Sequence, residues 1–163
     1  MKKASLVSLL LATVLISCSQ TNTSIKRGYA FYTVNLPGMI MKDEDGRDIQ
    51  PKLNLDRFIY IECSGTTMPI IESISYDNKP MKYELTRVQG KVVSVGKILL
   101  NGSDYTITTK KGYTIWKIDL VVADENVLIN RGCKNIIIKT RLGKKLTKFY
   151  LYKEIEIMGL PRY

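Results

Sequence analysis

The sequence predicts an all-β fold, an antiparallel β-sandwich of immunoglobulin-like or transthyretin-like outline with about nine short strands. Two observations predict it. From residue 28 onward, apolar side chains recur at every second position, which is the period of a strand with one buried face. The apolar runs are separated by turns rich in Gly, Asn and Asp, and no amphipathic helical pattern lies between them. Short strands repeated in this way are typical of layered β domains.

The expected strands follow one another from residue 29 to residue 157. Asn101-Gly102 is suited to a tight hairpin turn, and Gly96 predicts a bulge. Residues 77–80 are rich in turn formers, so the strands on either side of them are expected to form a hairpin. The strands are expected at residues 29–34, 39–41, 57–63, 70–76, 81–86, 92–100, 105–110, 113–122, 136–142 and 149–157.

Two of these strands define the expected core. In residues 57–63 the apolar alternation turns Cys63 inward, on the same face as Ile59 and Ile61. Residues 113–122 carry the most apolar face of the chain, which includes Trp116 and Ile118. This strand is therefore expected at the centre of the fold.

The first eighteen residues have the pattern of a secretory signal. A cationic start precedes an uncharged apolar run over residues 4–16, which is shorter than the roughly 20 residues that a spanning helix needs. The run ends in Leu15-Ile16-Ser17-Cys18, which resembles the lipobox of bacterial lipoproteins. The resemblance implies that residues 1–17 are removed and that Cys18 is acylated. The alternative is an ordinary signal peptide with a chance cysteine at the cleavage point.

The remainder of the chain is expected to form a tether and one domain. Residues 18–27 are mostly polar and small, as in a flexible linker, and residues 28–163 are long enough for a single core. Ser19 is not the aspartate that retains many lipoproteins at the inner membrane. By the same resemblance, the protein is expected on the periplasmic side of an outer membrane.

The charge of the chain favours anionic partners. Removal of residues 1–17 leaves 23 basic and 15 acidic residues. Outside the cytoplasm such an excess favours lipid headgroups, acidic glycans or an acidic protein face. Nucleic acid is not expected as a partner, because an exported protein rarely meets it.

Cys63 and Cys133 are the two cysteines that remain after Cys18 is assigned to acylation. Two cysteines in an oxidising compartment are expected to pair, and such a bridge would contribute roughly 4 kcal/mol on the chain-entropy estimate. The alternative is that both stay reduced and buried, since free cysteine packs as a small hydrophobe.

The composition argues against an enzyme. The chain has no histidine, which removes Ser-His-Asp and Cys-His arrangements and the usual imidazole metal ligands. The carboxylates Glu62, Glu72, Glu84, Glu154 and Glu156 fall where alternation predicts solvated strand faces. The acidic turn at residues 43–48 lacks the Glu that completes a calcium loop, so an ordinary polar turn is expected there. No metal and no cofactor are expected.

The last quarter of the chain is the most informative for binding. Residues 131–153 hold eight basic residues and no acid. If the strands pair about the turn at residues 143–145, cations and tyrosines share the outward face of the final hairpin, a composition suited to sugars, headgroups or a protein surface. The alternative is that lysines protect an edge strand and that a second sheet covers the tyrosines. The candidate residues are Lys139, Arg141, Lys144, Lys145, Lys148, Tyr150 and Tyr152.

Three segments, at residues 57–62, 74–79 and 111–118, resemble small all-β envelope lipoproteins common in Bacteroidota, with which no substrate or catalytic residue is associated. The resemblance implies a compartment and a fold. Together with the composition it leads us to expect a non-enzymatic, lipid-anchored binding or accessory subunit of an envelope protein complex. The alternatives are a binder of acidic glycan or lipid headgroups through the basic hairpin, and an immunity or inhibitor lipoprotein.

Overall fold

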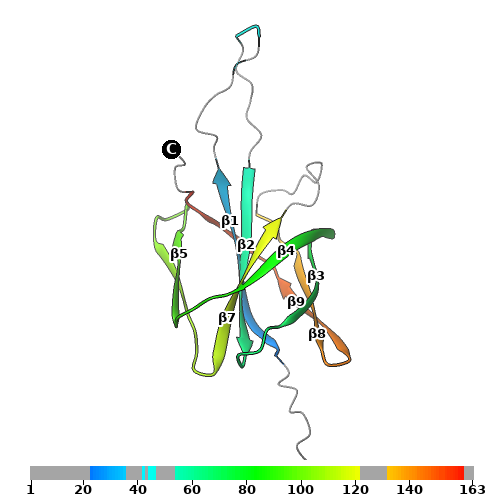
Figure 1. The fold of residues 1–163 in the computed structure, drawn as a ribbon. Helices are drawn as coiled ribbons and strands as arrows, with labels where there is room; N and C mark the ends of the chain where they lie inside the picture. The colour runs from blue at the N-terminus through cyan, green and yellow to red at the C-terminus, as the bar shows by residue number, and fades with distance from the viewer. Residues whose placement is uncertain (1–22, 36–41, 43, 47–53, 122–131, 160–163) are drawn as a thin grey trace, which may run out of the picture.

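A computed structural model describes residues 23–35, 42, 44–46, 54–121 and 132–159, and these residues form an all-β, sandwich-like fold (Figure 1). The all-β prediction is confirmed. The strands are β1 (Ile25–Asn35), β2 (Asn54–Ser64), β3 (Ile70–Tyr76), β4 (Lys79–Arg87), β5 (Val92–Lys97), β6 (Asp104–Thr108), β7 (Tyr113–Val121), β8 (Ile136–Leu142), β9 (Lys145–Leu151) and β10 (Glu154–Ile157).

Eight strands form one curled sheet in the order β10-β1-β2-β7-β4-β3-β8-β9, and β5 pairs with β6 in a separate hairpin. All pairs are antiparallel except β1 with β10, which is parallel. The curl brings β9 against β1, since a Cβ atom added to Gly28 would lie 2.8 Å from Cε1 of Phe149. Glycine is therefore needed in β1 at this close approach.

The concave side of the curled sheet encloses the larger core. Ile59, Ile118 and Ile138 contribute to it from three different strands and are fully buried. The strand β7 lies between β2 and β4, so the central position predicted for Trp116 and Ile118 is confirmed. Cys63 points into the same core, as the alternation of β2 predicted.

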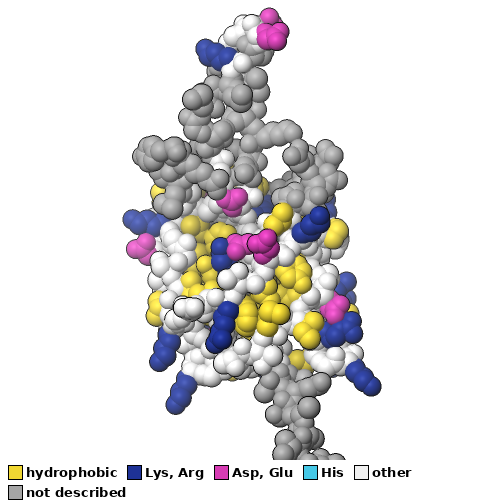
Figure 2. All heavy atoms as spheres, in the orientation of Figure 1, with side chains coloured by type: hydrophobic (Ala, Val, Ile, Leu, Met, Phe, Trp, Pro, Cys, Tyr) yellow, Lys and Arg dark blue, Asp and Glu magenta, His cyan; other side chains and the backbone are white. Residues whose placement is uncertain are grey.

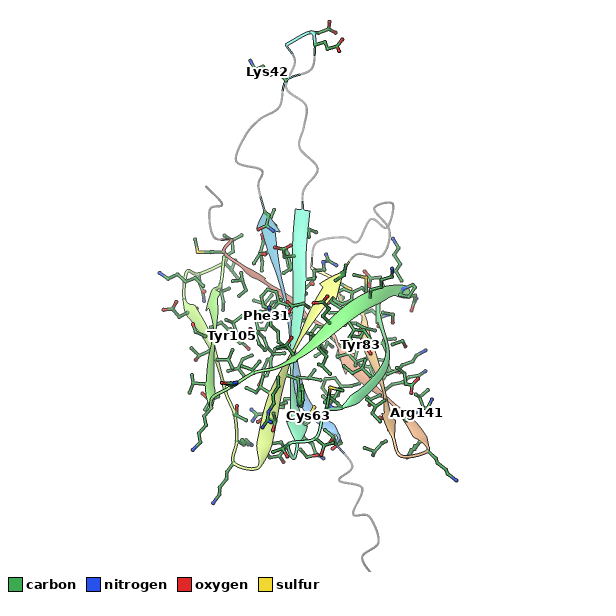
Figure 3. The ribbon with its side chains drawn as sticks, in the orientation of Figure 1. Phe31, Lys42, Cys63, Tyr83, Tyr105 and Arg141 are labelled. Carbon is green, nitrogen blue, oxygen red and sulfur yellow. The ribbon has the colours of Figure 1, made fainter. Side chains whose placement is uncertain are left out.

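A second core lies on the opposite side of β1, β2 and β7, beneath the β5–β6 hairpin. Phe31 and Tyr60 point into it from the sheet, and Val93 and Ile107 point into it from the hairpin. The rings of Phe31 and Tyr105 meet edge to face with centroids 5.1 Å apart (Figure 3). The centre of the sheet is consequently buried on both faces, which explains why β1 and β2 each contain a run of consecutive buried residues.

The β5–β6 hairpin is also fastened to β10. The amide of Leu99 donates to the carbonyl of Glu156, and the amide of Met158 donates to the carbonyl of Lys97. Gly96 has a φ of +134° and lies where a Cβ atom would be 2.7 Å from Cγ2 of Ile157. The bulge predicted at this glycine is confirmed by the register shift between Ser94 and Gly96.

Several expected boundaries differ from those of the structure. Residues 25–27, assigned to the tether, belong to β1, whose pairing with β2 begins at Ile25. Residues 98–100 form a turn apart from a bridge at Ile98, and residues 149–157 are divided between β9 and β10. The break arises because β9 pairs with β8 whereas β10 pairs with β1. The strand expected at residues 39–41 lies outside the described residues, and so does Val122, the last position of the strand expected at residues 113–122.

Candidate functional site

The candidate binding residues of the last quarter lie together on β8, on β9, in the turn between them and at Tyr152, directly after β9. The pairing register places Lys139 opposite Lys148, Ile137 opposite Tyr150 and Arg141 opposite Leu146. Because Ile136, Ile138 and Leu151 point into the larger core, the alternate residues form the outward face. We call the candidate residues of this hairpin the hairpin face. Lys139, Arg141, Lys148 and Tyr150 lie on the outward side of the strands, Lys144 is in the turn and Tyr152 follows β9; Lys145 pairs with Leu142 on the other side of the hairpin but is exposed beside the turn.

The two tyrosines of the hairpin face are exposed and stacked. The rings of Tyr150 and Tyr152 are nearly parallel, with an interplanar angle of 5° and centroids 6.1 Å apart. Tyr152 is 72% exposed and Tyr150 is also exposed, so no second sheet formed by the described residues covers them. An exposed aromatic pair supplies apolar contact area with little conformational entropy to lose on binding.

The charges of the hairpin face are only partly balanced. Glu72 of β3 forms an ion pair with the guanidinium of Arg141 (Figure 3 labels Arg141), and the hydrogen bond lowers the pKa of that carboxyl. Lys139 and Lys148 lie directly opposite each other, and like charges in this arrangement destabilise a sheet by up to about 1 kcal/mol. An anionic partner would remove this repulsion.

Lys145 and Lys148 are also placed where lysines protect an edge strand. β9 is last in the strand order of the eight-stranded sheet, beside β8, which makes it an edge strand. Its Lys145 and Lys148 are exposed. Lysines at such a position discourage pairing with another chain. Protection accounts for the charge, but it does not account for the exposed Tyr150–Tyr152 pair.

A buried ionic cluster lies in the larger core, at the end where β3 finishes and β8 begins. Nε of Arg57 is 3.7 Å from Oε1 of Glu154, and both side chains are almost wholly buried. The guanidinium of Arg57 lies over the ring of Tyr76, 5.4 Å from its centroid, and the amide of Cys133 donates to Glu154. Burial raises the pKa of Glu154 to about 7, against the opposing effect of Arg57. It also raises the pKa of Tyr76.

Glu62 is also buried, with 2% of its surface exposed. One of its carboxylate oxygens pairs with Nε of Arg27 at 2.6 Å, and the other accepts from the amide of Lys110. The expectation that Glu62 and Glu154 lie on solvated faces is therefore wrong. The second face of β2 is covered by the β5–β6 hairpin, and the break before β10 turns Glu154 inward.

One sequence signal could have revealed the burial of Glu62. Phe58 and Tyr60 lie on the same face of β2 as Glu62, so the strand is apolar on both faces apart from this residue. No comparable signal exists for Glu154, because its direction depends on the change of partner between β9 and β10.

Cys63 and Cys133 are buried and are not bonded to each other in the structure, which agrees with the reduced alternative and not with the disulfide. Cys63 lies near the end of β2, opposite Ile25, whereas Cys133 precedes β8 near the β3–β4 turn, at the opposite end of the same core. Figure 3 shows Cys63 near the lower end of the molecule. Burial raises the pKa of Cys63 to about 12 and that of Cys133 to about 11, which keeps both as unreactive thiols.

Some candidate residues fall outside the described part of the chain. Cys18 is one of them, and so are the first and the last two positions of the acidic turn at residues 43–48. Among the described residues, no three His, Cys, Asp or Glu side chains are grouped so that they could hold a metal ion. No helix in the described part is long and apolar enough to cross a membrane.

Comparisons with protein-family models, with curated proteins and with solved structures gave no significant match.

Proposed function

We propose that this chain is a non-enzymatic, lipid-anchored protein of a bacterial outer membrane that binds an acidic protein partner through the hairpin face, as an accessory subunit of an envelope complex. The exposed Tyr150–Tyr152 stack beside the opposed Lys139 and Lys148 carries the proposal. Protein interfaces are enriched in tyrosine, and burial of aromatic anchors supplies much of their binding energy.

The anchor and the lack of catalysis rest on other features. The Leu15-Ile16-Ser17-Cys18 sequence supports acylation by its resemblance to a lipobox. The absence of histidine and the burial of the thiols of Cys63 and Cys133 argue against nucleophilic and general acid–base chemistry.

Cross-linking in the native cells, followed by affinity purification, tests the proposed protein partner. We expect a stoichiometric partner with the wild-type chain, and at least a tenfold loss of it in Tyr150→Ala/Tyr152→Ala and in Lys139→Glu/Lys148→Glu. The matched control is Lys82→Glu/Lys97→Glu, which reverses two exposed lysines away from the hairpin face. Recovery of the same partner from all three variants would refute the assignment of the site.

A second candidate ligand is an acidic glycan or a lipid headgroup. The parallel rings of Tyr150 and Tyr152 beside Lys148 favour it, because sugar rings stack on aromatic faces and cations neutralise acidic groups. Binding of an acidic polysaccharide that weakens with salt and disappears in Lys139→Glu/Lys148→Glu would favour this ligand over a protein. Unchanged binding in that variant would exclude it.

A further inference from the structure

The segment that leads into β1 leaves the domain at one end of the sheet, and four turns meet it there. The amide of Ser64 donates to the carbonyl of Ser24, and the hydroxyl of Thr23 donates to the carbonyl of Thr67. The amide of Gly65 donates to the carbonyl of Gly112, which joins the β2–β3 connection to the β6–β7 connection. The amide of Thr109 donates to the carbonyl of Lys91, and the pairing of β3 with β8 places the β8–β9 turn at the same end.

This end is strongly cationic. The segments 23–26, 64–69, 88–91, 109–112 and 143–145 contain no acidic residue. We call their six exposed lysines the lysine end: Lys26, Lys91, Lys110, Lys111, Lys144 and Lys145. Figure 2 shows dark blue side chains at the lower left and lower right and acidic side chains only higher on this face.

The opposite end has no such excess. Among its described residues, Glu44, Asp45, Asp56, Asp77 and Asp104 lie with Lys42, Lys79, Lys97, Lys134 and Lys153 near the turns and strand ends, so acidic and basic residues are balanced there. The domain is therefore polarised along the strand direction, with its uncompensated positive charge at the end where the described chain begins.

Exposed apolar side chains accompany the lysines. Met68 and Ile70, in and after the β2–β3 connection, and Leu146, beside the β8–β9 turn, are each more than half exposed, at 58%, 57% and 52%. Ile70 and Leu146 lie in one row, because Arg141 pairs with both of them. Lysines with a few apolar side chains are the composition of surfaces that rest on anionic membranes.

We propose that the lysine end is a membrane-facing surface that binds the anionic headgroups of the bilayer and fixes the orientation of the domain. The proposal rests on the proposed function only for the lipid anchor that brings the bilayer near. Thr23 is five positions along the chain from Cys18, so an acyl chain at Cys18 would hold this end within about 18 Å of the headgroups. Lysines are attracted to an anionic surface, and the attraction extends over a Debye length of about 8 Å. Lys144 and Lys145 of the hairpin face would then contact the headgroups, and Lys139, Lys148, Tyr150 and Tyr152 would stand to the side of the attachment, open to a partner.

Headgroup quenching of site-specific fluorophores tests the orientation. The full chain, isolated from its own membranes, carries a label at Thr66→Cys in the lysine end or at Leu100→Cys, which is 93% exposed in the turn that leads from β5 to β6 at the opposite end. It is placed in vesicles with a nitroxide-headgroup lipid, made from phosphatidylglycerol with phosphatidylcholine or from phosphatidylcholine alone. We expect at least threefold stronger quenching at position 66 than at position 100 in the anionic vesicles, and a smaller difference in the neutral ones.

A charge-reversal variant separates headgroup contact from simple tethering. Lys110→Glu/Lys111→Glu/Lys144→Glu/Lys145→Glu is expected to abolish the difference between the two positions. The control Lys82→Glu/Lys97→Glu/Lys134→Glu/Lys153→Glu makes the same change of charge away from the lysine end and is expected to keep it. Circular dichroism of each variant checks folding. Equal quenching at both positions in wild-type protein would overturn the inference. A difference between positions 66 and 100 that persists after charge reversal of the lysine end would also overturn it.

The outcome is distinct from failure of the anchor itself. Mass spectrometry of Cys18 in protein from the native cells reports acylation independently of quenching. An acylated protein without preferred orientation refutes the lysine end and leaves the proposed function standing. A protein with a bare Cys18 that still orients on anionic vesicles refutes the lipid anchor of the proposed function and supports the lysine end.

Discussion

Arg57 and Glu154 form an ion pair that is excluded from water, with 3.7 Å between Nε and Oε1. Arg57 comes from β2 and Glu154 from β10, so the pair joins the centre of the sheet to its last strand across β1. A buried pair of this kind contributes little relative to apolar residues of the same size, but the loss of one partner leaves an uncompensated charge.

Arg57→Leu is therefore expected to lower the free energy of unfolding by about 3–5 kcal/mol. The double variant Arg57→Leu/Glu154→Leu should cost much less than the sum of its single variants. Urea unfolding at pH 8, analysed as a double-mutant cycle, measures this coupling. Additive effects would show that the two side chains do not act as a pair.

The stability of the domain is expected to depend on pH through Glu154. Burial raises its pKa to about 7 in the folded state, so between pH 5 and pH 7 the folded chain binds more protons than the unfolded chain. This contribution is fully present below the unfolded pKa and is lost as the pH rises through 7, by on the order of 3 kcal/mol in total. Urea unfolding from pH 5 to pH 8 should show the decline in wild-type protein, and Glu154→Gln should reduce it. An equal decline in both proteins would assign it to other groups.

The two glycines with positive φ at residues 96 and 102 provide a matched pair. A Cβ atom at Gly96 would lie 2.7 Å from Ile157, whereas Gly102 has nothing within 4 Å. Gly102→Ala should cost about 1 kcal/mol from backbone strain alone, and Gly96→Ala should cost roughly 1–3 kcal/mol more from overpacking against β10. Thermal unfolding of the two variants compares them. Similar losses of stability in the two variants would mean that the β5–β6 hairpin shifts away from Ile157 with no loss of stability.

The larger core should be sensitive to truncation at Ile138, which is fully buried in β8. Ile138→Ala is expected to lower the free energy of unfolding by about 2–5 kcal/mol, because it removes buried methyl groups and leaves a cavity. Leu100→Ala, at a residue that is 93% exposed, is the control and should change stability by less than about 0.5 kcal/mol. A small effect of Ile138→Ala in chemical denaturation would contradict the packing described for β8.

The thiols of Cys63 and Cys133 should be inaccessible in the folded protein and free once it unfolds. Burial and their raised pKa values prevent attack by an aromatic disulfide reagent in native conditions. Unfolding in guanidinium without a reductant should release two reactive thiols from these positions. Release of neither would mean that they are bonded in the protein from its native cells.

The alternation of apolar residues was sufficient to predict an all-β fold, the inward direction of Cys63 and the central place of Trp116. It also predicted that Lys139 and Lys148 share the outward face of one hairpin, because the β8–β9 turn is local, although the turn is shorter than the expected residues 143–145 and Lys145 already pairs with Leu142. These features depend on a few neighbouring residues, which a single sequence displays directly.

The tertiary structure alone decided which strands were covered twice and where the chain changed partners. Docking of the β5–β6 hairpin buried Glu62, the parallel pairing of β10 with β1 buried Glu154, and the length of the core separated Cys63 from Cys133. Each of these outcomes depends on contacts between residues far apart in the chain. A single strand held a signal only for Glu62, through the apolar Phe58 and Tyr60 on the same face of β2. The gathering of six lysines at one end has the same origin, because they come from separate connections that meet only when the sheet is assembled.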